Sequence, residues 1–192
     1  MAALMIDRFL EAAPAEGRTA YEKRWRSIVH EHADFVWRAL RRLGVLEADL
    51  ADGAQQVFLV LARKLNHVAS GAERGFLFQT AFRVASDSRR TRRRQREVPD
   101  DLLALHTDER PGPDEDLEVR LRRAQLDRIL DLLPMDLRAV FVLSELEEMT
   151  MAEIASMTGT RPGTVASRLR RARAAFIGQV ARLHEREKQG GS

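Results

Sequence analysis

The stretch TMAEIASMTGTRPGTVASRLRRAR, Thr150 to Arg173, decides the fold, because it contains the start and stop signals of two consecutive helices. Thr150 and Glu153 are spaced as a capping box, in which side chains satisfy the free N–H groups at a helix start. Gly159 suits the left-handed turn that ends many helices. Pro162 suits the first turn of a helix, where its missing N–H costs nothing. The stretch therefore predicts a short helix, a turn and a second helix.

The second of these helices is amphipathic. Val165, Leu169, Ala172 and Phe176 fall on one helical stripe, and Ala155 of the first helix is small enough for close approach. This is the spacing of a helix-turn-helix. The opposite face presents small, hydroxyl and cationic side chains: Gly163, Thr164, Ser167, Arg170 and Arg171, with Arg168 on the flank. Two interpretations remain open, a solvated cationic surface helix and a helix that reads DNA.

The composition limits the class of protein. The chain has 192 residues and a net charge of +3, with 32 Lys and Arg. Only three of these are Lys. Arginine is the residue that forms bidentate hydrogen bonds with phosphate and guanine. A GC-rich coding sequence would give the same excess of arginine over lysine. Only the positions of the arginines can therefore show whether they bind nucleic acid.

Other composition features favour an intracellular protein. There is no Cys, which excludes disulfides and thiolate metal sites. No apolar run approaches the ~20 residues needed to span a bilayer. The N-terminus contains acids and lacks a basic segment, so it is a poor signal peptide. We expect a soluble, cytoplasmic protein without membrane insertion.

The rest of the chain is predicted to be all-α, because apolar residues recur at helical spacing and no strand pattern is present. A long helix from Tyr21 ends at Gly44, a second runs from about Leu50 to Leu65, and Gly71 and Gly75 are expected to bracket a turn. An arginine-rich segment follows, and then a stretch with nine acids and three Pro that is expected to be a linker. We expect these parts: an extension (1–19), a first helical domain (20–96), an acidic flexible linker (97–118), a second helical domain (119–184) and a tail (185–192).

The second domain begins with an apolar face that Pro134 ends. Asp136 is predicted to cap the next helix. Glu145, Glu147 and Glu148 are interpreted as a solvated acidic cluster at a helix end.

From Leu133 to Phe176 the chain resembles region 4 of bacterial sigma factors of the extracytoplasmic-function group, within the sigma-70 family. The pattern L-P, R-x-V-F-x-L, S/T-x-x-E-I-A and G-T-V-x-S-R-L-x-R-A-R fixes core and surface positions over more than 40 residues. DLADGAQQVFLVLARKL (Asp49–Leu65) resembles the polymerase-docking helix of region 2 in that family. GFLFQTAFRVASDSRRTRRR (Gly75–Arg94) resembles the segment that engages the melted promoter element. The resemblance covers roughly Tyr21 to Leu183.

The resemblance implies a transcription-initiation role with no catalytic residues, metal or cofactor. It implies as partners core RNA polymerase (the coiled coil of the largest subunit and the flap of the second-largest subunit), promoter DNA and an anti-sigma factor. Residues implied to read the −35 element are Arg161, Gly163, Thr164, Ser167, Arg168, Arg170 and Arg171. Those implied to capture the melted −10 element are Phe78, Phe82, Arg83, Asp87, Arg89, Arg90 and Arg93. Those implied to dock on polymerase are Asp49, Asp52, Gln55 and Gln56.

Several positions depart from the family pattern. Arg83 stands where the family usually has Asn, which bears on base choice in the −10 element. Gln56 stands at a usually acidic position, and Ala166 stands where Lys or Arg normally follows G-T-V. Arg161 stands at the usual Ser cap position, where Thr160 offers a substitute. For Phe78 an ordinary core role is the alternative to base contact.

The sequence also bears on other classes of protein. An enzyme is not expected, because no phosphate-binding loop or nucleophile motif occurs, and His30 and His32 face different sides of a helix. A stand-alone helix-turn-helix regulator is the main alternative, and its first domain would then supply a dimer interface or ligand pocket. A protein-binding adaptor is the third, and it predicts no salt-dependent binding to DNA.

Overall fold

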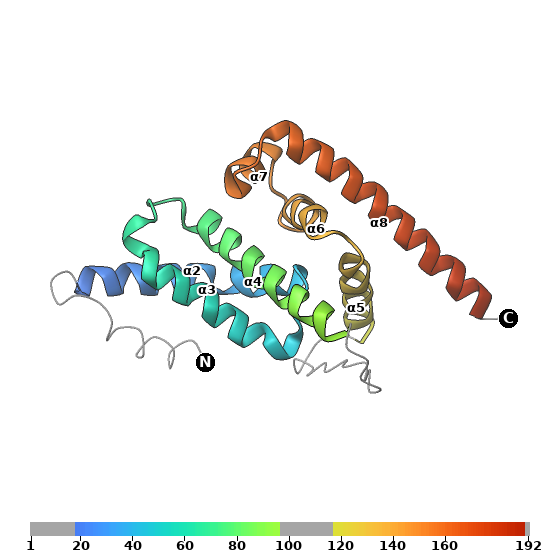
Figure 1. The fold of residues 1–192 in the computed structure, drawn as a ribbon, viewed down its shortest axis with the longest axis horizontal. Coiled ribbons are helices and arrows are strands. Elements are labelled where there is room, and N and C mark those ends of the chain that lie inside the picture. Colours follow the sequence, from blue (N-terminus) through green and yellow to red (C-terminus); the bar gives the residue numbers. More distant parts are fainter. Residues whose placement is uncertain (1–17, 97–116, 191–192) are drawn as a thin grey trace.

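The computed structural model describes residues 18–96 and 117–190, and every regular element within them is helical (Figure 1). The all-α prediction is therefore confirmed. In chain order the elements are α2 (Arg18–Arg42), η1 (Glu47–Asp49), α3 (Leu50–Lys64), η2 (Leu65–His67), α4 (Glu73–Arg96), α5 (Leu117–Asp131), α6 (Met135–Phe141), η3 (Val142–Leu146), α7 (Met151–Thr158) and α8 (Pro162–Gly190).

Most of the predicted extension and linker lies outside the described residues. Their last residues already belong to α2 and α5. Helix α8 continues through the boundary expected at 184 and ends at Gly190.

Helices α2, α3 and α4 pack together as the N-terminal group. The predicted stripe of α2 is buried at Trp25, Val36 and Leu40, and the helix ends just before Gly44, whose φ is +94°. Gly75 does not close a turn as expected. It lies inside the first turn of α4, where it faces Met157 of α7.

Helices α5 to α8 form the C-terminal group. The apolar face of α5 is buried at Ile129 and Leu130. The prediction that Asp136 caps the next helix is wrong. Pro134 is the N-cap residue of α6, and the Asp136 carboxylate instead pairs with Arg168 of α8 at 3.3 Å. Asp136 therefore ties α6 to α8 and does not hold its own helix start.

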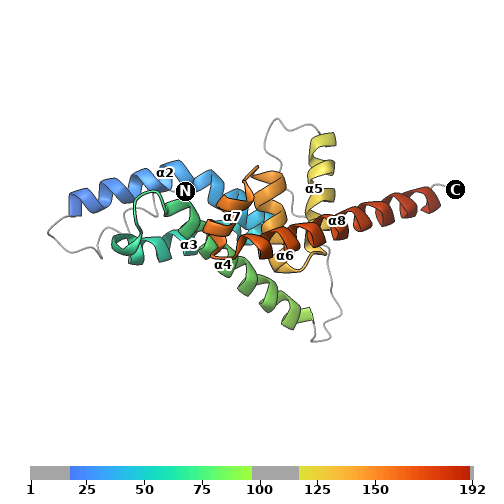
Figure 2. The ribbon, with the colours of Figure 1, turned by 90° about the horizontal axis from the view of Figure 1, so that it is seen from above.

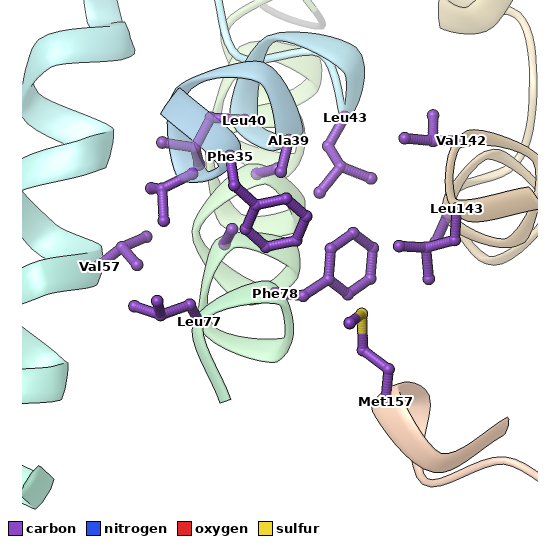
Figure 3. Close-up of a cluster of buried hydrophobic side chains, with 14 of the residues drawn as sticks. Phe35, Ala39, Leu40, Leu43, Val57, Leu77, Phe78, Val142, Leu143 and Met157 are labelled. Carbon is purple, nitrogen blue, oxygen red and sulfur yellow. The ribbon is translucent and has the colours of Figure 1, made fainter. Parts of the chain in front are cut away.

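The two groups share one continuous hydrophobic core (Figure 3). The Phe78 ring of α4 lies 6.4 Å from that of Phe35 in α2, at a 40° tilt. Leu143 of η3 and Met157 of α7 approach Phe78 from the other side (Figure 3). Phe78 is only 1% exposed, so it belongs to the junction between the groups.

A buried guanidinium crosses the same junction. Arg138 of α6 is 0% exposed, donates to the main-chain carbonyl of Arg42 and pairs with Asp131. Burial lowers the pKa of Arg138, and the charge of Asp131 opposes that shift. A Cβ on Gly44 would lie 2.8 Å from Nη1 of Arg138 and 2.9 Å from the Asp131 carboxylate. A glycine at 44 is therefore required by the local backbone and by the space that Arg138 fills.

Gly44→Ala is expected to destabilise the protein more than Gly71→Ala. Both glycines have positive φ, but a Cβ at Gly71 (φ +87°) meets nothing within 4 Å. The backbone strain of about 1–3 kcal/mol is common to both variants. Displacing the buried Arg138 pair adds a further loss of about 1–3 kcal/mol in Gly44→Ala alone. Urea unfolding of both variants measures the difference, and equal losses would contradict the role assigned to Arg138.

Candidate nucleic-acid interface

The predicted helix-turn-helix is present in α7 and α8. The Glu153 N–H donates to the Thr150 hydroxyl oxygen at 3.3 Å, and the Thr150 N–H donates to the Glu153 carboxylate at 2.8 Å. This confirms the capping box. Gly159 ends α7 with φ +63°, and Pro162 is the first residue of α8. Within Thr150–Arg173, the capping box, Gly159 and Pro162 therefore have their predicted roles.

The apolar stripe fixes how α8 is rotated. Val165 and Ala172 are fully buried and Leu169 is nearly so. The Phe176 ring stacks on that of Phe141 in α6 with centroids 4.7 Å apart. Because these contacts face inward, the other side of α8 must face solvent.

The predicted −35 residues occupy that solvent-facing side. Arg161, Gly163, Thr164, Arg170 and Arg171 are exposed, and Ser167 is half-buried. The first turn of α8 carries no acid, so the positive end of its helix dipole is not neutralised there by a carboxylate. The structure therefore brings most of the predicted residues to one cationic surface at a helix start.

Two positions, one on α8 and one just before it, differ from the others. Arg168 is held by the Asp136 carboxylate and turns toward the junction between the two groups. The Thr160 hydroxyl donates back to the carbonyl of Thr158 at 3.4 Å, so it does not take over the cap of α8.

The predicted −10 residues lie along α4 but differ in accessibility. Phe78 is in the core, which agrees with the alternative weighed for it and removes its ring from any base in this arrangement. Phe82 is half-buried and Arg83 is exposed. Both line a cleft of ≈ 350 Å³ between α4 and the C-terminal group, together with Phe78, Gln79, Asp136, Ala139, Val140, Thr158, Thr160 and Arg168.

The arginine run continues along α4. Arg89 donates to the Asp131 carbonyl at 2.9 Å, and its other guanidinium nitrogen lies 3.6 Å from the Asp131 carboxylate. Arg90 pairs with Asp87 on its own helix at 3.2 Å. Arg89, Arg90 and Arg93 line a second hollow of ≈ 470 Å³, with Arg92 and Asp131.

The predicted polymerase-docking residues lie at the start of α3. Asp49 precedes the helix, and Asp52 and Gln56 follow at the spacing of one helix face. These three residues are exposed and Gln55 is half-buried. In Figure 1 helix α3 lies on the side of α4 that faces away from α6, α7 and α8.

The interpretation of Glu147 as a solvated acid is wrong. Its side chain is 7% exposed and pairs with three arginines of the N-terminal group: Arg42, Arg74 (3.3 Å) and Arg38 (3.7 Å). We call Glu147 and these three arginines the Glu147 cluster. Burial lowers the pKa of Arg42, and the Glu147 charge opposes that shift. Glu145 does lie at the surface, where a hydrogen bond from Arg173 lowers the pKa of its carboxyl.

Within residues 18–96 and 117–190 no group of three or more His, Asp or Glu side chains is placed to hold a metal ion. Over the same residues no helix combines the length and apolar character needed to cross a bilayer.

The C-terminal group matches a known DNA-binding class. Residues 123–176 match the family model described as sigma-70, region 4. The match covers most of α5, all of α6 and α7, and α8 as far as Phe176.

Curated relatives extend the match over most of the chain. It is 31% identical over 161 residues to the ECF RNA polymerase sigma factor SigE of Mycolicibacterium smegmatis, covering 83% of this chain and 62% of that protein. It is 28% identical over 177 residues to the RNA polymerase sigma factor NccH of Alcaligenes xylosoxydans xylosoxydans, covering 88% of this chain and 91% of NccH. The chain is therefore similar over most of its length to RNA polymerase sigma factors, one of them of the extracytoplasmic-function group, and it spans 62% of the length of that relative.

Solved structures show the same fold. CnrH, solved in complex with the cytosolic domain of CnrY, superposes with a TM-score of 0.63 at 20% identity, covering 93% of this chain and 96% of CnrH. RpoE of Bartonella quintana, solved with the anti-sigma factor NepR, superposes with a TM-score of 0.65 at 18% identity, covering 83% of this chain and 98% of RpoE. At these identities the likeness concerns the fold alone.

Thr150→Ala is expected to destabilise the helix-turn-helix by about 1 kcal/mol, and Thr150→Ser to retain most of the stability, because serine keeps the capping hydroxyl. Hydrogen bonds from Thr150 lower the pKa of Glu153 below its ordinary 4.5. The carboxylate's contribution is therefore complete above that pH and is lost as the pH falls through the lowered pKa. Thermal unfolding of both variants at neutral and acid pH should show the Ala deficit shrinking in acid. An undiminished deficit would contradict a stabilising hydrogen bond from the Thr150 hydroxyl to the Glu153 carboxylate.

Proposed function

We propose that this chain is an RNA polymerase sigma factor that binds core polymerase and directs initiation at promoters with specific −10 and −35 elements. The observation that carries the proposal is the cationic start of α8, held outward by the buried Val165, Leu169 and Ala172. Similarity to the sigma-70 region 4 model and to curated sigma factors supports the rest of the assignment.

In this proposal the start of α8 enters the major groove at the −35 element. The free N–H groups and positive dipole of the helix start suit a DNA phosphate. Arg170 and Arg171 are exposed and can donate bidentate hydrogen bonds to O6 and N7 of guanine. Each such pair favours guanine over the wrong base by about 1–3 kcal/mol. Gly163 has no neighbour within 4 Å of a built Cβ, so it leaves room for the DNA backbone.

Helix α4 is proposed to capture the −10 element as a single strand. Such capture combines flat apolar surfaces for splayed bases with cations for the phosphates. Phe82 and Arg83 border the same cleft and supply one group of each kind. Arg89, Arg90 and Arg93 extend the cationic track along the helix.

The partners proposed are core polymerase, contacted by Asp49, Asp52, Gln55 and Gln56 and by region 4, and an anti-sigma factor. RpoE of B. quintana was solved with an anti-sigma factor, and CnrH with the cytosolic domain of CnrY. We propose a regulatory subunit without catalysis of its own, acting in the cytoplasm where polymerase and DNA are found.

The proposal is tested by mixing the purified chain with bacterial core RNA polymerase, followed by gel filtration and transcription from the promoter region of its own gene. Co-elution with specific initiation is expected. Absence of co-elution combined with tight binding of duplex DNA by the chain alone would indicate a stand-alone regulator. Neither activity would indicate a protein-binding adaptor.

Arg171→Ala is expected to weaken recognition of the −35 element and to leave core binding unchanged. Loss of one guanidinium contact should cost about 1–3 kcal/mol for the preferred sequence. Initiation from promoters with intact and scrambled −35 elements measures the effect, with core affinity measured in parallel. Arg182→Ala is the matched control, because Arg182 is exposed on the same helix about three turns further on. Equal losses of promoter recognition and core binding in Arg171→Ala would overturn the assignment.

A further inference from the structure

We propose that the outer face of the C-terminal half of α8 is a self-association surface, to which a second copy of this chain binds antiparallel through the same face. The residues of this outer face recur at intervals of three or four positions, with two neighbours at its centre, so they form one stripe along the helix. Six exposed residues define the outer face: Arg170, Ala174, Ile177, Gly178, Ala181 and Glu185.

Within residues 18–96 and 117–190 no helix covers the outer face, since all six of its residues are exposed. The opposite side of α8 packs inward through the buried Leu169 and Ala172, and the half-buried Phe176 and Leu183 continue that side. Figures 1 and 2 show the C-terminal half of α8 extending beyond α5, α6 and α7. Most of the outer face also lies beyond the match to the region 4 model, which ends at Phe176.

The centre of the outer face carries two residues that packing within one copy does not account for. Ile177 is 67% exposed, more than any other large apolar side chain among the described residues. Gly178 lies within the helix, where glycine is less stable than alanine, and a Cβ built there meets nothing within 4 Å. One copy alone therefore has room for a side chain at 178. A projecting isoleucine beside an absent side chain offers a knob next to a hole.

A second, antiparallel copy matches the knob to the hole. With a two-fold axis midway between Ile177 and Gly178, Ile177 of each copy lies against the partner's Gly178. The absent side chain lets the two helix backbones approach closely. Ala174 then lies opposite the partner's Ala181, and both side chains are small. The outer face is thus complementary to itself, which a two-fold dimer requires.

The two ends of the outer face are complementary in charge. The same axis places Arg170 opposite the partner's Glu185, and symmetry forms this pair twice. A parallel arrangement would instead place Arg170 against the partner's Arg170. The charges therefore favour a second copy in the antiparallel orientation. The paired segment is about 24 Å long at 1.5 Å per residue, which is short for a stable interface, so we expect a weak dimer with micromolar affinity.

Pairing covers part of the proposed −35 surface, and this consequence rests on the proposed function. Arg170 belongs to both surfaces, and the partner's α8 continues past it toward Ser167 and Thr164. The partner helix then lies where the DNA major groove would lie. A second copy and the −35 duplex therefore compete for α8.

The test is charge reversal in the full chain, followed by sedimentation velocity over a range of concentrations. Arg170→Glu and Glu185→Arg each turn both attracting pairs of the dimer into repelling pairs, and each is expected to raise the dissociation constant about 10-fold or more. An equal mixture of the two variants brings opposite charges together again at both ends, so it is expected to dimerise as the parent chain does. Arg26→Glu is the matched control, because Arg26 is exposed on α2 in the N-terminal group, and it should match the parent.

Three results would overturn the inference: a parent chain that stays monomeric at hundreds of micromolar, a dimer that either reversal leaves intact, or a mixture of folded variants that stays monomeric. Circular dichroism checks folding. If either reversal does not fold, Ile177→Ser removes the knob and is expected to raise the dissociation constant about 10-fold or more. An unchanged dimer in Ile177→Ser would equally overturn the inference.

The same measurements separate this inference from the proposed function. If both hold, a duplex carrying the −35 element of the chain's own promoter converts dimer to DNA-bound monomer. If the chain is not a sigma factor, core polymerase and the duplex fail to bind, while the dimer and its charge-reversal pattern remain. If the function is right and the pairing is not, specific initiation is present and the free chain stays monomeric.

Discussion

Burial of Arg138 is the constraint on which the junction between the two helical groups depends. Removing a guanidinium from water costs several kcal/mol, and this cost is offset only where the geometry supplies a counter-charge and acceptors. The Asp131 carboxylate and the Arg42 carbonyl provide these, and Gly44 leaves the space. Nη2 of Arg138 has no partner among the described residues. The arrangement therefore specifies one relative placement of α2 and α6, because any shift would leave a buried charge unpaired.

The sequence was informative where the controlling interactions are local. The capping box, the left-handed Gly159 and Pro162 each act within one or two helical turns, so their spacing predicts the helix-turn-helix directly. The apolar stripe of α8 is also a local pattern, and it fixed which residues face outward. This is why the outward-facing residues of α8 could be predicted almost one by one.

Prediction failed where partners are far apart in the chain. The sequence predicts a solvated Glu147 and a capping Asp136, because each residue type suits that role at a helix boundary. The partners of Glu147 lie 73 to 109 residues away, and the partner of Asp136 lies 32 residues away. The spacing of residue types along the sequence does not indicate such distant pairs. For Phe78 the sequence allows both a core role and a contact with DNA, and the packing of Leu143 and Met157 places its ring in the core.

The composition of the junction bears on the cost of separating the two helical groups. Guanidiniums of the Glu147 cluster are 25–49% exposed, so water replaces lost partners at low cost when the groups separate. The apolar contact around Phe78 has no such replacement by water. Separation of the two groups removes Leu143 and Met157 from the Phe78 ring, while Phe35 remains beside it in the N-terminal group. One face of the Phe78 ring would then be exposed to water at the proposed −10 surface. A splayed base stacking there would recover about 1–3 kcal/mol. On this argument the burial of Phe78 and its predicted contact with DNA describe two states of one surface, in which a base replaces the C-terminal group.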